Sequence, residues 1–155
     1  MKKYIIFGIV LVVAGLIYGV IDLANAKKQK ENLISYNRDI RPVLSDKCFS
    51  CHGPDVSKVK AGLRLDLPAS AFAELEKNKG HFAIVPGHPE KSELIKRVSS
   101  NDPAIMMPVP ESHLARLTTD EIKLFTRWIE QGAKYEKHWA FVAPIKEAIP
   151  EVDNT

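Results

Sequence analysis

Cysteine is scarce in this sequence: its 155 residues include only two, both in the segment Cys48-Phe49-Ser50-Cys51-His52. Two cysteines this close together exclude a framework of several disulfides. They also supply too few thiolates for a structural zinc site, which takes four nitrogen or sulfur ligands. A thioredoxin-like redox pair would need a βαβ context that the flanking sequence does not show.

The spacing Cys-x-x-Cys-His is instead typical of the site at which a c-type haem is attached. Each thiol adds to one vinyl group of the haem, and the imidazole that follows at once falls beneath the iron as an axial ligand. The segment therefore predicts one covalently bound haem c, held by Cys48 and Cys51, with His52 as the proximal ligand of the iron.

Other signatures are missing as well. The formal net charge is only +3, which gives no reason to expect a nucleic-acid partner. No internal repeat, glycine-rich phosphate loop, nucleophile–base pair or convincing pair of carboxylates is visible. The chain is therefore not expected to be an enzyme by itself.

The N-terminus has the organisation of a targeting segment. Met1-Lys2-Lys3 is basic, residues 4–21 are apolar or small, and Ala24-Asn25-Ala26 resembles a cleavage site. Signal-peptide cores run about 7–15 residues and spanning helices about 18 or more, so residues 1–26 are a signal peptide or a membrane anchor. Either reading predicts that the rest of the chain lies outside the cytoplasmic membrane, on the periplasmic side, exported or membrane-anchored.

The remaining chain is long enough for one hydrophobic core but not for two. Residues 27–35 are predicted to be a polar tether, 36–143 the folded domain, and 144–155 a linker or tail. Apolar spacing, prolines and glycines predict an all-α domain of about four helices. The predicted helices are Asn37–Lys47, Pro68–Asn78, Pro89–Val98, and one that starts at the capping box Thr118-x-x-Glu121 and stops at Gly132.

The second axial ligand is predicted to be a methionine. Met106 and Met107 lie in a proline-rich loop before the last predicted helix, and Pro108 stiffens that loop. Met107 is preferred because it directly precedes Pro108, with Met106 as the alternative. The other candidates are four histidines: His81, His88, His113 and His138.

Two basic residues shortly after the motif, Lys60 and Arg64, are candidates for pairing with the haem propionates. Arginine in particular favours bidentate recognition of carboxylates. A solvated charge on a loop explains each of them equally well.

Several spaced segments occur in a fixed order: 36–55, 60–66, 83–98, the Met-Pro loop, and 117–133. Together they resemble the planctomycete-type cytochrome c domain over about residues 36–143. The resemblance implies a class I cytochrome c-like fold around one haem, with the first and last helices packed together. It also implies that Cys48, Cys51 and His52 bind haem and that the family's Met-Pro-Pro segment corresponds to Met107-Pro108-Val109, where valine replaces the second proline.

Three functions follow from these features. The first is an exported or membrane-anchored monohaem cytochrome that transfers single electrons between a redox donor and a redox acceptor. The second is a haem-bearing front domain of a larger oxidative or peroxidase-like enzyme, since further domains commonly follow in this family. The third is a haem-based ligand sensor. Methionine and histidine ligation fills both axial positions and therefore favours electron transfer.

Overall fold

The computed structural model describes residues 33–137, 139–141 and 143, together with the single positions 15, 18, 19 and 22. The chain divides into two units, Met1–Leu33 and Ile34–Thr155. Apart from those single positions, the predictions for residues 1–32 and 144–155 lie outside the described residues. In the described part of the chain, no helix has the length and apolar character needed to cross a membrane.

The first predicted helix is present, but it is divided. It consists of a π-helical turn, η1 (Tyr36–Ile40), followed by α2 (Arg41–Lys47), and α3 (Phe49–His52) carries the cysteine motif. Pro42 explains the wide first turn, because its ring would clash with the carbonyl four residues earlier in a regular α-helix. The N–H of Arg41 instead donates to the carbonyl of Tyr36.

The second predicted helix, Pro68–Asn78, is wrong beyond its first turn. The helix α4 covers only Pro68–Ala71, and the chain then forms β1 (Glu74–Leu75) and β2 (Asn78–Phe82), which pair antiparallel. A short helix is marginal on its own, so tertiary contacts decide its length. Here the hairpin replaces the later turns, and Gly80 in β2 has a φ of +80°, which glycine adopts at little cost.

The third predicted helix, Pro89–Val98, is interrupted in its first half. Pro89–Lys91 form the 3-10 turn η2, and α5 begins only at Glu93 and ends at Val98. Ser92 separates the two because its backbone is extended, and its buried hydroxyl donates to the carbonyl of His88 at 3.0 Å.

The last predicted helix is confirmed as α6 (Thr119–Glu130). Its capping box is complete: the Thr118 hydroxyl accepts from the N–H of Glu121 at 3.2 Å, and the Glu121 carboxylate accepts from the N–H of Thr118 at 2.6 Å. Gly132 follows the helix with a φ of +95°. These contacts satisfy N–H groups that the first turn leaves without partners.

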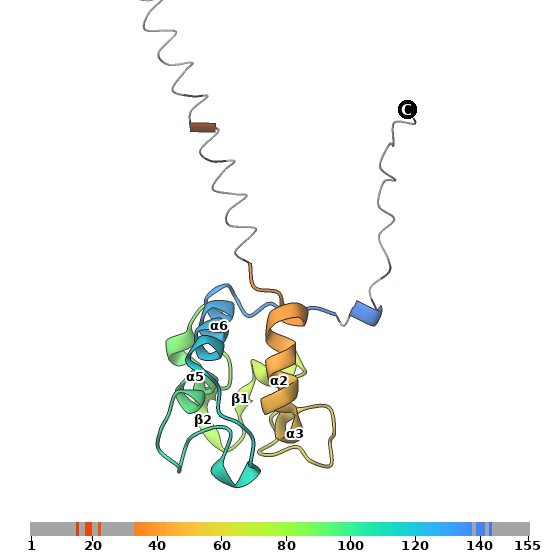
Figure 1. Ribbon diagram of the computed structural model, residues 1–155, viewed down its shortest axis with the longest axis vertical. Coiled ribbons are helices and arrows are strands. Elements are labelled where there is room, and N and C mark those ends of the chain that lie inside the picture. The colour runs from red at the N-terminus through yellow and green to blue at the C-terminus, as the bar shows by residue number, and fades with distance from the viewer. Residues whose placement is uncertain are drawn as a thin grey trace, which may run out of the picture. The chain divides into compact units, whose positions relative to one another are not determined.

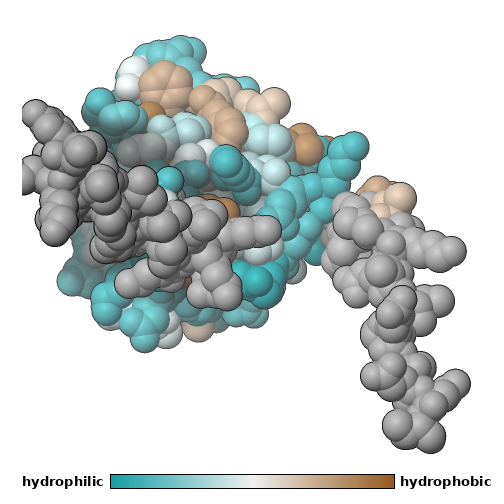
Figure 2. All heavy atoms as spheres, turned by 90° about the horizontal axis from the view of Figure 1, so that it is seen from above, coloured by the Kyte–Doolittle hydropathy of each residue, from teal (hydrophilic) through white to brown (hydrophobic). Residues whose placement is uncertain are grey.

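The core of the second unit lies between its first and last helices. In Figure 1, α2 and α3 lie on one side of the domain and α5 and α6 on the other, and α6 contacts both α5 and η1. The largest fully buried apolar side chains come from η1, α2, α6 and the segment after β2: Ile40, Leu44, Ile84, Phe125, Trp128 and Ile129. On the face shown in Figure 2, hydrophilic and hydrophobic residues of the described part are interspersed.

The predicted fold class, an all-α class I cytochrome c-like fold of about four helices, is wrong, and the apolar N-terminal helix predicted in front of it lies, apart from single positions, outside the described residues. The described residues form five α-helices and a two-stranded sheet, and no apolar span is found among them. Two further 3-10 turns complete the elements, η3 (Pro110–Ser112) and η4 (Trp139–Phe141). Prolines and the hairpin shorten most of these helices, and among the helices of the described residues only α6 exceeds seven residues.

The beginning and the end of the domain are joined by hydrogen bonds. The carboxylate of Glu136 accepts from the Ser35 hydroxyl at 3.0 Å and from the N–H groups of Tyr36 and Asn37 at 3.2 Å each. The side chain of Gln131 accepts from the N–H of Ile34 at 2.9 Å. Segments about 100 residues apart in sequence therefore meet at one place.

Candidate haem-binding site

A cavity of about 270 Å³ opens among α3, α5 and the loop that leads to α6. Its walls are mostly apolar and come from segments spread over the whole domain: Leu63, Leu65, Leu75, Ala83, Leu94, Val98, Pro108, Val109, Leu114 and Leu117. A concave apolar site with a few polar groups at its edge is typical of a cofactor-binding site.

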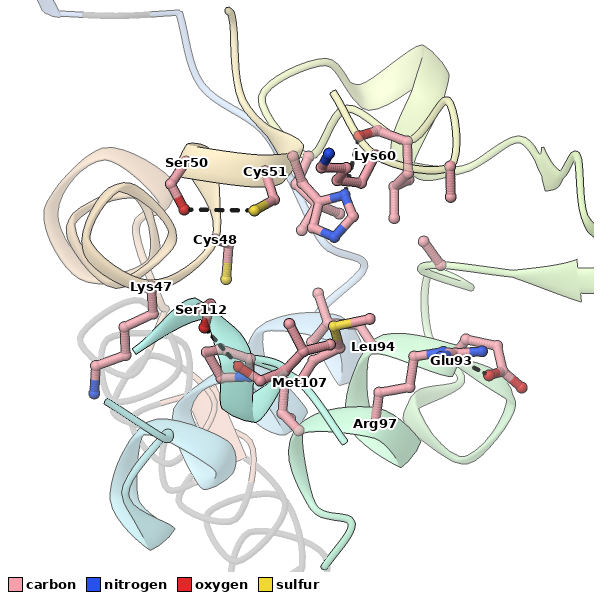
Figure 3. Close-up of a pocket in the computed structure, with 18 of the residues that line it drawn as sticks. Lys47, Cys48, Ser50, Cys51, Lys60, Glu93, Leu94, Arg97, Met107 and Ser112 are labelled. Atoms are coloured by element: carbon pink, nitrogen blue, oxygen red, sulfur yellow. Dashed lines mark hydrogen bonds and ion pairs between the residues drawn. The ribbon is translucent and has the colours of Figure 1, made fainter. Parts of the chain in front are cut away.

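Both cysteines line this cavity as free thiols. Cys48 lies between α2 and α3, and Cys51 lies one helical turn further on, in α3. The two thiols are therefore on the same side of the cavity (Figure 3). Burial raises the pKa of the Cys48 thiol to about 12, against the smaller opposite effect of Lys47. The hydroxyl of Ser50 donates to the Cys51 sulfur at 3.8 Å.

His52, at the end of α3, lines the same cavity and has one ring nitrogen fixed. Its Nδ1 lies 3.2 Å from the carbonyl oxygen of Leu63. Because a carbonyl only accepts, Nδ1 carries the proton and Nε2 keeps its lone pair. Burial lowers the pKa of His52, Arg97 lowers it further, and the hydrogen bond to Leu63 opposes them. The imidazole is therefore neutral near pH 7, as a metal ligand must be.

Met107 lies across the cavity from Cys51 and Lys60 (Figure 3). Its backbone N–H donates to the carbonyl of Arg97 in α5 at 3.1 Å, which fixes the loop against that helix. Met106 is not among the residues that line the cavity, and its N–H donates to the carbonyl of Asp102. Of the two methionines proposed from sequence, the structure places Met107 at the site.

The histidines proposed as alternatives do not line the cavity in the described part of the chain. His81 and His88 pair with glutamates, at 2.9 Å and 3.0 Å, and His113 is exposed in a left-handed turn. His138 lies outside the described residues.

The two proposed propionate partners differ in position. Lys60 lines the cavity. Arg64 does not, and its guanidinium pairs with Asp66, with Nε 3.0 Å from Oδ1. The sequence did not distinguish them, because residue order alone does not show that the Arg64 guanidinium faces Asp66 and not the cavity.

Four charged residues of the cavity wall were not proposed from the sequence: Lys47, Lys77, Glu93 and Arg97. Lys77 lies in the hairpin turn, an element that was not predicted. Glu93 and Arg97 are one helical turn apart in α5, and such a pair usually marks a solvent-exposed helix face. Glu93 lies four residues after the start of the predicted helix, and its charge gave no sign that its side chain is buried.

Comparison with known families bears on this site. Residues 48–111 match the family model described as Planctomycete cytochrome C. The resemblance found in the sequence is confirmed over this segment, which holds the cysteine motif, α5 and the Met-Pro loop. No curated protein and no solved structure matches the chain. A planctomycete cytochrome c domain implies haem binding and a role in electron transfer.

The residues around this cavity fit a haem. The walls are apolar, as the porphyrin plane requires, and the thiols lie beside the imidazole whose Nε2 lone pair is available. Basic side chains at the cavity suit the two carboxylates of a haem. The donor set of one imidazole and one thioether is the one used by cytochromes c.

Proposed function

We propose that this cytochrome c domain binds one covalent haem c and transfers single electrons between a donor and an acceptor redox protein. The observation that carries the proposal is that Cys48, Cys51, His52 and Met107 line one apolar cavity. When bound, the haem supplies an iron that alternates between the ferric and ferrous states.

The protein's part is to hold the ligands in place. Leu63 fixes the tautomer of His52, and the hydrogen bond to Arg97 fixes the backbone of Met107. Cys48 and Cys51 would hold the ring through thioether bonds. His52 and Met107 would both hold the iron and would leave no coordination site for a substrate, which supports electron transfer over peroxidase-like chemistry or gas sensing.

We also propose that the domain works on the periplasmic side of the cytoplasmic membrane. The basic and apolar segment 1–26 supports this location, either as a cleaved signal peptide or as an anchor. Attachment of haem to Cys-x-x-Cys-His takes place outside the cytoplasm, so the two proposals agree.

The test is the absorption spectrum of the full chain made together with c-haem maturation. We expect haem to stay attached after denaturation, and the oxidised protein to show the weak far-red band of methionine-ligated iron. Met107→Ala should abolish that band, because Met107 lines the cavity. Met106→Ala is the matched control and should keep it.

Three results would contradict the proposal. Release of the haem on denaturation would exclude covalent attachment. High-spin iron in the wild-type protein would favour the enzymatic or sensor alternative. Loss of the far-red band in Met106→Ala but not in Met107→Ala would show that Met106, and not Met107, is the iron ligand.

A further inference from the structure

One carboxylate beside the cavity is buried and contacts three basic side chains. The side chain of Glu93 is only 6% exposed. Its Oε1 lies 2.9 Å from His81 Nδ1 and 3.1 Å from Lys96 Nζ, and its Oε2 lies 3.2 Å from Arg97 Nε. Burial raises the pKa of Glu93, but the hydrogen bonds from Lys96 and His81 outweigh burial and keep that pKa below its ordinary value. The carboxylate is therefore ionised near pH 7.

Only part of the Arg97 guanidinium is used by this carboxylate. Nε binds Glu93, while the two terminal nitrogens have no hydrogen-bond partner among the described residues. A guanidinium carries five donors, so most of its capacity remains. Arg97 lines the cavity, and Figure 3 shows it on the Met107 side beside Glu93.

The same residue also touches the loop of the second axial ligand. The carbonyl of Arg97 accepts the N–H of Met107 at 3.1 Å. The side chain of Arg97 and the backbone of Met107 are therefore fixed by one turn of α5.

The other basic residues that line the cavity differ from Arg97 in their partners and in their exposure. Lys47 is engaged with Glu121 at 2.6 Å. Lys60 and Lys77 have no ion-pair partner in the described part of the chain, but both are exposed and lie on flexible stems. Arg97 is the half-buried base that another side chain holds in a fixed orientation.

We propose that Arg97 binds a carboxylate group of the cofactor and that Glu93 is the positioning residue that aims its guanidinium into the cavity. This inference rests on the proposed haem-binding function. A fork of N–H donors held by a buried carboxylate matches a second carboxylate in geometry and in charge. The pairing assigns to Arg97 the role that the sequence suggested for Arg64.

The experiment compares the haem-loaded full chain with Arg97→Gln, Glu93→Gln and Lys96→Gln. Lys96→Gln is the matched control, because it removes another cation from Glu93 that does not line the cavity. The readouts are the propionate bending modes in the resonance Raman spectrum and the reduction potential near pH 7.

We expect Arg97→Gln and Glu93→Gln to shift the propionate modes, and Lys96→Gln to leave them unchanged. Loss of a cation near the iron disfavours the ferrous state, so Arg97→Gln should lower the potential. A tenfold change in the redox equilibrium is expected, which is about 59 mV for a one-electron couple. A general loosening of the fold would not shift the propionate modes selectively.

Propionate modes that are unchanged in Arg97→Gln would overturn the inference while the haem spectrum upholds the proposed function. A wild-type chain without attached haem would overturn both. If Arg97→Gln does not accumulate as a haem protein, Arg97→Lys replaces it, since lysine keeps the charge but loses the fork. Wild-type propionate modes in Arg97→Lys would then also overturn the inference.

Discussion

At the level of single residues, His52 is held by a short series of hydrogen bonds that reaches the end of the domain. Its Nδ1 donates to Leu63, and its carbonyl accepts from the N–H of Leu65 at 2.8 Å. The carbonyl of Leu65 in turn accepts from the Tyr135 hydroxyl at 3.0 Å. Burial raises the pKa of Tyr135, so this phenol remains a donor throughout the neutral range.

Replacement of Tyr135 by phenylalanine should remove one link of this series. The lost hydrogen bond leaves the buried Leu65 carbonyl without this partner, which should lower the free energy of unfolding by about 1 kcal/mol. Denaturant unfolding of both proteins measures the difference. An unchanged free energy would show that water replaces the hydroxyl, and the haem spectrum should stay that of the wild type.

The individual site residues were predictable to different degrees. Cys48, Cys51 and His52 lie within five consecutive residues, so their motif can be recognised in the sequence alone. Glu93 was not predictable, because its burial depends on the hairpin bringing His81 against α5. Partners that lie far apart in sequence leave no local pattern.

At the level of elements, one ion pair joins the helix before the motif to the last helix. Lys47 Nζ lies 2.6 Å from Glu121 Oε2, and the two side chains are 9% and 24% exposed. The same carboxylate completes the capping box of α6 by accepting from the N–H of Thr118. Glu121 therefore stabilises the start of α6 and its contact with α2 at once.

The ion pair between Lys47 and Glu121 predicts that Glu121→Gln lowers the stability of the fold, and that this effect depends on pH. Near pH 7 the free energy of unfolding of the variant should be about 2 kcal/mol lower than that of the wild type, since a charged hydrogen bond is lost. Burial raises the pKa of Glu121, but hydrogen bonds from Lys47 and Thr118 outweigh it and hold that pKa below its ordinary 4.5. A depressed pKa stabilises the fold above the unfolded-state pKa, and this contribution fades as pH falls through the folded-state pKa.

The free energies of unfolding of wild type and Glu121→Gln should therefore converge as the pH falls through the lowered pKa of Glu121 in the folded protein. Lys123→Gln is a suitable control, because Lys123 pairs with Asp120 at the exposed surface of the same helix. A difference between wild type and Glu121→Gln that is equal at acidic and neutral pH would contradict the role given to the ion pair.

The elements were predicted best where a local signal is strong. The capping box placed the start of α6 correctly, because both of its bonds lie within four residues. The region after Pro68 was assigned wrongly, since the spacing of Phe72 and Leu75 fits either a helix or a hairpin. Both side chains do pack against the core, but from a turn and a strand.

At the level of the whole molecule, the cofactor cavity is part of the hydrophobic core. Leu65, Leu94 and Val98 belong to the buried cluster and also line the cavity. An unfilled apolar cavity costs contacts on all its walls. The cofactor and the fold should therefore depend on each other.

This dependence predicts a large loss of stability without haem. The double variant Cys48→Ser, Cys51→Ser, made without haem, should lose more than about 3 kcal/mol of unfolding free energy, as in large cavity-forming substitutions. Thermal unfolding followed by circular dichroism measures the change. A melting temperature equal to that of the haem protein would show that the core closes without the cofactor.

The contacts of Glu136 and Gln131 with residues 34–37 have a mechanical consequence. The chain enters and leaves the domain at one place, so tension on its two ends acts first on these hydrogen bonds. These hydrogen bonds would break one after another before the force reaches α3 or α5. Pulling on either end of the domain would thus leave the cavity and the residues that line it undisturbed until these hydrogen bonds had been lost.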